Sequence, residues 1–202
     1  MSRAVIFGGG VYDNNFPVLT DEDYIIAADA GYEILEKRGI IPHITIGDFD
    51  SSKKIPSENV VVLPVEKDVT DTHAAVNIAL EKGFDEIAVY GGMGGRPDHT
   101  FANFTLAAFL AVKGVKAYCT GEGYTVTAIR DSAVIIEGTP GKTVSVFSWS
   151  EKCEGVTLKG LKYALEKAEL TNTYALGVSN SFVDDKAEIS VEKGILLVMF
   201  EN

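Results

Sequence analysis

The stretch Thr45-Ile46-Gly47-Asp48-Phe49-Asp50-Ser51-Ser52 decides how the rest of the chain is interpreted. It begins inside a short β-branched run, residues 44–46, which predicts a buried strand. Gly47 ends that strand, and two carboxylates, Asp48 and Asp50, follow at alternate positions. Side chains of an extended segment alternate with a period of two, so these carboxylates point the same way. Such a pair suits a hard divalent cation, which prefers oxygen ligands. The other interpretation is a solvated turn, where Asp and Ser are common.

The composition is that of an ordinary globular protein. The chain has 202 residues, 46% of them hydrophobic and 23% charged, which is enough apolar material for one large domain or two small ones. The net charge of −11 argues against nucleic-acid binding, which needs a basic surface. No apolar run reaches the roughly 18 residues of a membrane span, and the first apolar stretch is too short for a signal peptide. We therefore expect a cytoplasmic protein with no membrane partner.

Residues 1–122 alternate between strand-like and helix-like segments. Strands are predicted at 4–7, 24–28, 44–46, 60–63, 87–90 and 115–120, and helices at 30–38, 71–82 and 99–113. This alternation is typical of a parallel sheet with helices on both faces. The strand at 60–63 is apolar throughout, so we expect it to be buried on both faces. Phe101, Phe104 and Ala108 are expected to form the core-facing stripe of the last helix.

From about residue 123 the helical spacing largely disappears. Short β-type runs are found at 126–129, 133–136, 143–147, 187–191 and 195–200, separated by turn residues. The alternation of apolar and polar residues at 187–192 is typical of a strand with one exposed face. We therefore predict an α/β domain over residues 1–122, followed by a small antiparallel β domain over residues 123–202.

Acidic residues follow four of the predicted strands. They are Asp29, the pair Asp48 and Asp50, the pair Asp68 and Asp71, and Asp98. The active sites of parallel sheets lie outside the carboxyl ends of the strands, so these residues are expected to converge on one crevice that suits Mg²⁺. Lys67 and Arg96 are the cations available there for phosphate groups. Any single position has a simpler interpretation as a helix cap, and Thr70, Asp71 and Asp98 are well placed for that role.

Two glycine clusters are candidate phosphate-binding loops. Residues 91–95 precede a predicted helix, where backbone N–H groups can approach an anion closely. No Gly-Lys-Ser/Thr follows, so this is not a Walker loop. Residues 8–10 are a second candidate, with a plain turn as the alternative. His73 and His99 each begin a helix beside an aspartate, either as ligands or acid–base groups or as ordinary first-turn residues.

Two stretches of the β domain combine polar and aromatic residues. They are Gly160-Leu161-Lys162-Tyr163-Ala164-Leu165 and Gly177-Val178-Ser179-Asn180-Ser181. Ser179 and Asn180 carry groups that can hydrogen-bond a flat heterocycle, and a simple turn is the alternative interpretation.

Together these motifs resemble those of bacterial-type thiamine pyrophosphokinase. The matching segments, in the family's order, are Gly47-Asp48-Phe49-Asp50-Ser51, Glu66-Lys67-Asp68-Val69-Thr70-Asp71-Thr72, Gly94-Gly95-Arg96-Pro97-Asp98-His99, residues 160–165, and Ser179-Asn180. The resemblance implies an N-terminal parallel-sheet α/β nucleotide-binding domain and a C-terminal antiparallel β-sandwich that binds thiamine and forms a homodimer. It implies an ATP:thiamine diphosphotransferase that moves a pyrophosphoryl group from ATP to thiamine, giving thiamine diphosphate and AMP, with Mg²⁺ as cofactor.

The same resemblance assigns roles to particular residues. Catalytic roles fall on Asp29, Asp48, Asp50, Asp71 and Asp98, with the metal on Asp48, Asp50 and Asp71. Nucleotide, metal or phosphate binding falls on Asp68, Arg96 and Asp98, and we expect Lys67, Thr70 and His99 to take part in it as well. Contacts to the thiamine pyrimidine, near the dimer interface, fall on Ser179 and Asn180. The sequence departs from the family pattern at Asp29-Ala30-Gly31-Tyr32, where Asp-Gly-Gly-Ala is usual, and at Ala164, where proline is common.

The residues by themselves leave two other functions open. A metal-dependent phosphohydrolase would use the same acidic crevice to activate water, and Asp98-His99 beside Asp48 and Asp50 would support it. Release of phosphate without an acceptor would favour that enzyme. A non-catalytic nucleotide-binding module would instead bind ATP without turnover under any acceptor.

Overall fold

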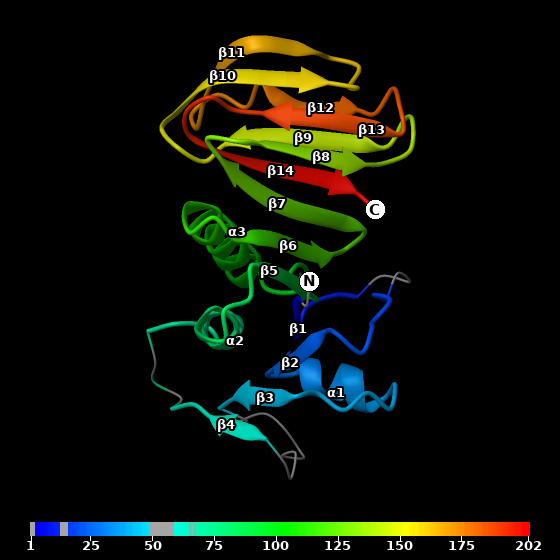
Figure 1. The fold of residues 1–202 in the computed structure, drawn as a ribbon, viewed down its shortest axis with the longest axis vertical. Coiled ribbons are helices and arrows are strands. Elements are labelled where there is room, and N and C mark those ends of the chain that lie inside the picture. The colour runs from blue at the N-terminus through cyan, green and yellow to red at the C-terminus, as the bar shows by residue number, and fades with distance from the viewer. Residues whose placement is uncertain (1–2, 13–15, 49–58, 65, 67) are drawn as a thin grey trace. The chain divides into compact units, whose positions relative to one another are not determined.

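The computed structural model describes residues 3–12, 16–48, 59–64, 66 and 68–202. The chain divides into two compact units (Figure 1). The first unit extends to Leu106 and also includes Ala117–Glu122. The second comprises Ala107–Lys116 and Gly123–Asn202. No helix in the described part of the chain is long and apolar enough to cross a membrane.

The first unit is built on a parallel sheet. Its strands are β1 (Ala4–Phe7), β2 (Tyr24–Ala28), β3 (Ile44–Gly47), β4 (Val60–Val62), β5 (Glu86–Tyr90) and β6 (Lys116–Gly121). They lie in the order β6-β5-β1-β2-β3-β4. The pairs from β5 to β4 are all parallel, as the alternating sequence pattern predicts (Figure 1). The carboxyl ends of β5, β1, β2, β3 and β4 therefore lie along one edge of the sheet.

Both faces of this sheet carry buried apolar side chains. The helices are α1 (Gly31–Glu36), α2 (Asp71–Glu81) and α3 (Pro97–Val112), and the residues of α3 from Ala107 onward belong to the second unit. Val5 and Phe7 of β1 cluster with Leu35 of α1. The alternate residues Ala4 and Ile6 point to the other face and are fully buried. Helix α2 contacts β1, β2, β3 and β5, so the central strands are held between helices.

The expected burial of 60–63 is wrong. Strand β4 lies at the edge of the sheet, where it has one neighbouring strand, β3. Val61 and Val62 are accordingly 37% and 67% exposed. An unbroken apolar run is typical of a central strand, but the run alone does not show which strand is outermost.

The expected core stripe of α3 is also partly wrong. Phe101 is 63% exposed, whereas Asn103, Leu106 and Leu110 are buried. Apolar residues occur almost all round this helix, so their spacing does not fix which side is buried. The buried side contains an asparagine where the sequence pattern had suggested a phenylalanine.

The second unit contains the predicted antiparallel β domain, and its two sheets pack as a sandwich. The strand orders are β12-β9-β14-β7 and β11-β10-β13-β8. The strands are β7 (Tyr124–Arg130), β8 (Ala133–Glu137), β9 (Thr143–Ser148), β10 (Lys152–Lys159), β11 (Leu165–Thr171), β12 (Gly177–Ser181), β13 (Lys186–Ser190) and β14 (Ile195–Glu201). One buried cluster joins Val146 and Val198 of the first sheet to Val156 and Ile189 of the second. Strands β10, β11 and β12 were not predicted, because their residues are mostly polar or charged.

Gly31 tests how closely the start of α1 approaches β1. A Cβ atom built on Gly31 would lie 1.9 Å from the carbonyl oxygen of Phe7. We expect Gly31→Ala to lower the free energy of unfolding by about 3 kcal/mol, since the clash is with buried backbone. Urea unfolding followed by circular dichroism measures the change.

Gly39→Ala is the matched control for that substitution. Gly39 has a φ of 67° but no atom within 4 Å of the added Cβ, so only left-handed backbone strain of about 1 kcal/mol is expected. Equal losses in the two variants would contradict the close approach of α1 to β1.

Candidate active site

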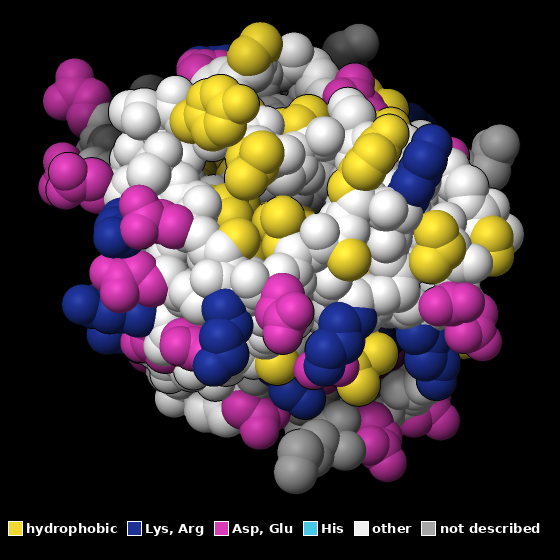
Figure 2. All heavy atoms as spheres, turned by 90° about the horizontal axis from the view of Figure 1, so that it is seen from above, with side chains coloured by type: hydrophobic (Ala, Val, Ile, Leu, Met, Phe, Trp, Pro, Cys, Tyr) yellow, Lys and Arg dark blue, Asp and Glu magenta, His cyan; other side chains and the backbone are white. Residues whose placement is uncertain are grey.

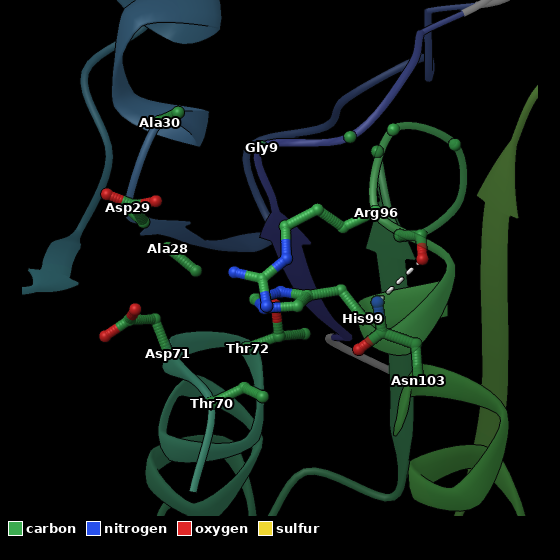
Figure 3. Close-up of a pocket in the computed structure, with 15 residues that line it drawn as sticks. Gly9, Ala28, Asp29, Ala30, Thr70, Asp71, Thr72, Arg96, His99 and Asn103 are labelled. Carbon is green, nitrogen blue, oxygen red and sulfur yellow. Dashed lines mark hydrogen bonds between the residues drawn. The ribbon is translucent and has the colours of Figure 1, made fainter. Parts of the chain in front are cut away.

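A cavity of about 330 Å³ opens in the first unit at the carboxyl ends of its parallel strands. Four segments line it: the loop after β1, the end of β2, the start of α2, and the loop from β5 into α3 (Figure 3). The cavity brings together five residues that the sequence analysis had singled out, namely Asp29, Thr70, Asp71, Arg96 and His99. Acidic and cationic side chains therefore face a common space.

The two glycine clusters form one interlocked wall of this cavity. The backbone N–H groups of Gly8 and Gly10 donate to the carbonyls of Tyr90 and Gly91, each at 2.8 Å. A Cβ atom on Gly10 would lie 2.4 Å from the Gly91 oxygen. The glycines after β1 are thus needed for close packing against the second loop. The N–H groups of Gly8 and Gly10 are hydrogen-bonded to the second loop, so they do not bind a phosphate.

Tyr12 holds the two loops of this wall together through hydrogen bonds. Its hydroxyl donates to the carbonyl oxygens of Gly8, at 2.7 Å, and Tyr90, at 3.1 Å. A side chain on Gly91 would run into the Tyr12 ring at 2.4 Å. Burial raises the pKa of the Tyr12 phenol, so the hydroxyl remains a donor at neutral pH.

Asp29 is presented by an unusual backbone conformation. It follows β2 directly and has a φ of 50°, a left-handed value that aspartate tolerates better than most residues. Its N–H donates to the carbonyl of Ile46 on β3 at 2.8 Å. Ala30 has ordinary right-handed angles, so this first departure from the family pattern introduces no backbone strain. The essential glycine of the turn, Gly31, is retained.

Asp48 follows β3 at the same sheet edge and is half-buried. Strand β3 pairs with β2 so that Ile46 lies beside Ala28, which places Asp29 and Asp48 one and two residues beyond that pair. Asp50 and Lys67 fall outside the described residues. Within the described ranges, no three His, Cys, Asp or Glu side chains form a metal-binding group.

Thr70 caps helix α2. Its hydroxyl accepts a hydrogen bond from the N–H of His73 at 3.2 Å, and Asp71 is the first helical residue. The capping role considered from sequence is therefore present, and the cap itself lies in the cavity wall. Burial lowers the pKa of His73, which is half-buried in the first turn. The positive end of the α2 dipole lies at the cavity.

Arg96 and Asp98 form an ion pair at the start of α3. The guanidinium donates Nε to Oδ1 at 3.2 Å and one terminal nitrogen to Oδ2 at 2.6 Å. Both side chains are largely exposed. The hydrogen bonds from Arg96 hold the pKa of the Asp98 carboxyl below its usual value. Asp98 therefore orients Arg96 toward the cavity and is a weak proton acceptor. Asp68 is exposed, and neither Asp68 nor Asp98 lines the cavity.

The two stretches singled out in the β domain lie side by side. The side chain of Asn180 accepts from the N–H of Tyr163 at 2.9 Å and donates to its carbonyl at 2.7 Å. The N–H of Lys162 donates to the Ser181 carbonyl at 2.9 Å. Asn180 is 3% exposed, whereas Tyr163 is 60% exposed. Asn180 thus holds Tyr163 at the surface, a role that the sequence analysis did not foresee.

Ser179 is exposed and has a φ of 59°. Its N–H donates to the hydroxyl of Ser145 at 3.1 Å, which leaves the side chain at the surface. Ala164, the second departure from the family pattern, is exposed as well. An alanine there displaces no packed neighbour.

Asn103 lines the cavity but was missed in the sequence analysis. Its amide nitrogen donates to the Gly92 carbonyl at 2.6 Å (Figure 3). The available signal was its spacing, since it precedes Leu106 and Leu110 by three and seven residues on α3. A polar residue in such a buried series is a candidate for function.

Comparison with known proteins agrees with this geometry. Residues 17–119 match the family "Thiamin pyrophosphokinase, catalytic domain", and residues 132–196 match "Thiamin pyrophosphokinase, vitamin B1 binding domain". The thiamine pyrophosphokinase of Bacillus subtilis is 32% identical over 191 residues, covering 89% of this chain and 88% of that protein.

Solved structures show the same fold. The crystal structure of thiamine pyrophosphokinase from Bacillus subtilis superposes with a TM-score of 0.88 at 28% identity, covering 99% of both chains. The thiamin pyrophosphokinase structure from Geobacillus thermodenitrificans gives a TM-score of 0.83 at 27% identity, covering 100% of this chain and 98% of that one.

The chain belongs to the thiamin pyrophosphokinase family. Its activity is that of a thiamine diphosphokinase, an enzyme of thiamine diphosphate biosynthesis. The resemblance inferred from the motifs is thereby confirmed. This assignment replaces the two alternatives that the residues alone left open, a phosphohydrolase and a non-catalytic module.

Asn180→Ala tests the proposed support of Tyr163. The substitution removes both hydrogen bonds to the Tyr163 backbone, and we expect a loss of about 1–2 kcal/mol in the free energy of unfolding. Ser179→Ala, at the exposed neighbouring position, is expected to change stability by less than about 0.5 kcal/mol. Chemical denaturation measures both, and equal effects would remove the structural role given to Asn180.

Proposed function

We propose that the cavity of the first unit binds ATP and that its residues position the pyrophosphoryl group for transfer to thiamine. The observation that carries this proposal is the shared cavity itself. It holds the carboxylates Asp29 and Asp71 together with the cationic Arg96, at the start of both α2 and α3 (Figure 3). Pyrophosphoryl transfer needs mainly positioning and charge neutralisation, which this combination supplies.

The carboxylates supply the kind of oxygen ligand that a magnesium ion prefers. Asp29 and Asp71 both line the cavity, and Asp48 follows the strand next to the one that Asp29 follows. An all-oxygen donor set of this kind suits a hard cation. We propose Asp48 and Asp71, together with Asp50, as its ligands. When bound, Mg²⁺ would neutralise phosphate charge.

Arg96 and the N-termini of α2 and α3 would hold the phosphates of ATP. A planar guanidinium can bind two phosphate oxygens at once, and Asp98 fixes its orientation through two hydrogen bonds. The backbone N–H groups that begin α2 and α3 add partial positive charge. His99 lines the same cavity and supplies a further donor.

We propose Asp71, rather than Asp98, as the residue that orients or deprotonates the thiamine hydroxyl. Asp98 is engaged by Arg96, which lowers its pKa and weakens it as a base. Asp71 is the first residue of α2, and it lines the cavity. A proton acceptor must be within reach of the proton it takes, and Asp71 lines the cavity in which we place the reaction.

The β-sandwich would bind thiamine through Ser179 and the exposed ring of Tyr163, with Asn180 as support. Thiamine carries a cationic thiazolium, for which an aromatic face is favourable. We propose a homodimer with this site near its interface. Hydrophobic side chains gather on the face shown in Figure 2, and Tyr174, Leu176 and Val178 are among the exposed apolar residues of this domain. A cytoplasmic location is proposed as well, because the reaction consumes ATP.

Asp48→Asn tests the metal assignment. The substitution removes one negative charge with little change in shape, so we expect kcat to fall by at least about 100-fold while the circular dichroism spectrum is retained. Mn²⁺ titration followed by electron paramagnetic resonance should show weaker ion binding.

Asp85→Asn is the control for this test. It makes the same change on an exposed residue just before β5, at the opposite end of the strands. We expect activity and Mn²⁺ binding in this variant to match those of the unmodified chain. Near-normal turnover in Asp48→Asn would overturn the role of Asp48 in the metal site.

A further inference from the structure

Asn103 is a polar residue at a buried position of α3. Its side chain is 8% exposed, and Leu106 and Leu110 on the same side of the helix are 4% and 1% exposed. A buried amide is destabilising unless its donor and acceptor are both used. The partners of this amide therefore indicate what the residue does.

The orientation of the amide is fixed by the glycine loop. Its nitrogen donates to the carbonyl oxygen of Gly92 at 2.6 Å. A carbonyl oxygen only accepts hydrogen bonds, so the amide nitrogen must face Gly92 and the oxygen must face the other way. Figure 3 shows the oxygen directed away from the loop, toward the side where His99 and Thr72 lie.

The Asn103 oxygen is an acceptor available to a ligand. In the described part of the chain, no hydrogen bond is donated to it. Among the described residues, the fully buried side-chain atoms that lack a hydrogen-bond partner do not include this oxygen. The oxygen is therefore accessible, and the space beside it is the cavity that Asn103 lines. A rigid, uncharged acceptor is thus presented to whatever fills this space.

The Asn103 oxygen disfavours a phosphate group beside it and favours a ligand group that donates a hydrogen bond. Phosphate oxygens accept hydrogen bonds and repel another oxygen, whereas Arg96 in the same cavity attracts them. The nucleoside part of ATP carries N–H and O–H donors, namely the exocyclic amine of the base and the ribose hydroxyls. Asn103 also lies within the catalytic-domain match, outside the vitamin B1 binding match.

We infer that Asn103 is a nucleoside-recognition residue, whose side-chain oxygen accepts a hydrogen bond from the exocyclic amine or a ribose hydroxyl of ATP. The inference rests on the proposed nucleotide site. A site built around such a hydrogen bond discriminates against a ligand that lacks the donor, because its own polar group is then left unpaired.

The test is a specificity ratio. We would measure kcat/KM with ATP, with inosine triphosphate, and with 2′-deoxy- and 3′-deoxy-ATP, for the unmodified chain and for Asn103→Leu. The unmodified chain should prefer ATP over one of the three analogues by about 10-fold. In Asn103→Leu that preference should fall to within about 2-fold. Loss of the inosine preference identifies the amine as the donor, and loss of a deoxy preference identifies the hydroxyl.

Cys119→Ala is the matched control. The Cys119 sulfur packs under the same loop, since a Cβ on Gly92 would lie 2.4 Å from it, but Cys119 does not line the cavity. This variant should lower stability or turnover without altering any nucleotide ratio. Asn103→Ala serves if Asn103→Leu does not fold. An unmodified chain without any preference, unchanged ratios in the Asn103 variants, or a rise confined to the KM for thiamine would each overturn the inference.

Arg96→Ala separates this inference from the proposed function. If ATP binds in the cavity, this variant raises the KM for every nucleotide by a similar factor. If Arg96→Ala leaves all of these KM values unchanged, the nucleotide site lies elsewhere and the proposed function fails. A raised KM in Arg96→Ala with constant ratios in Asn103→Leu rejects only the role of Asn103.

Discussion

The cavity depends on one packing constraint, the contact between the two glycine loops that follow β1 and β5. Their backbones approach so closely that a side chain on Gly10 would overlap the carbonyls of Gly91 and Met93. Three hydrogen bonds, from the N–H groups of Gly8, Gly10 and Val11, join the loops. Backbone groups joined in this way have little freedom to move, so the loops form a firm wall.

Charged groups are then placed around the same cavity by local features of the chain. A left-handed residue presents Asp29, a threonine cap begins α2 at Asp71, and an aspartate orients Arg96. Each feature uses backbone conformation or a short hydrogen bond, and none requires a large apolar contact at the site. Phosphate binding of this type relies on positioning, which explains why a parallel sheet edge is a suitable platform. Asn103 adds an uncharged acceptor from the buried side of α3.

Much of this arrangement could be predicted from the sequence. The alternation of segments predicted the parallel sheet, because it is a local pattern. Of the aspartates expected to converge on one crevice, Asp29 and Asp71 line the cavity, whereas Asp68 and Asp98 do not. The edge position of β4 was not predictable, since exposure of Val61 and Val62 depends on strand order. The phase of α3 was missed for a similar reason: its apolar residues surround the helix, and only tertiary packing selects the side with Asn103.

In the β domain, the sequence identified the right stretches but not their relation. Gly160–Leu165 and Gly177–Ser181 meet through Asn180, whose amide binds the backbone of Tyr163. A side chain with donor and acceptor groups looks the same in sequence whether it binds a ligand or a distant loop. Long-range pairing of this kind is visible only in the structure.

We propose that one cavity in this chain transfers an intact pyrophosphoryl group from ATP to thiamine. The most direct measurement is phosphorus NMR of the products after incubation with ATP, Mg²⁺ and thiamine, with each component omitted in turn. We expect AMP and thiamine diphosphate in equal amounts, and only in the complete mixture. Formation of ADP or inorganic phosphate without thiamine would contradict it.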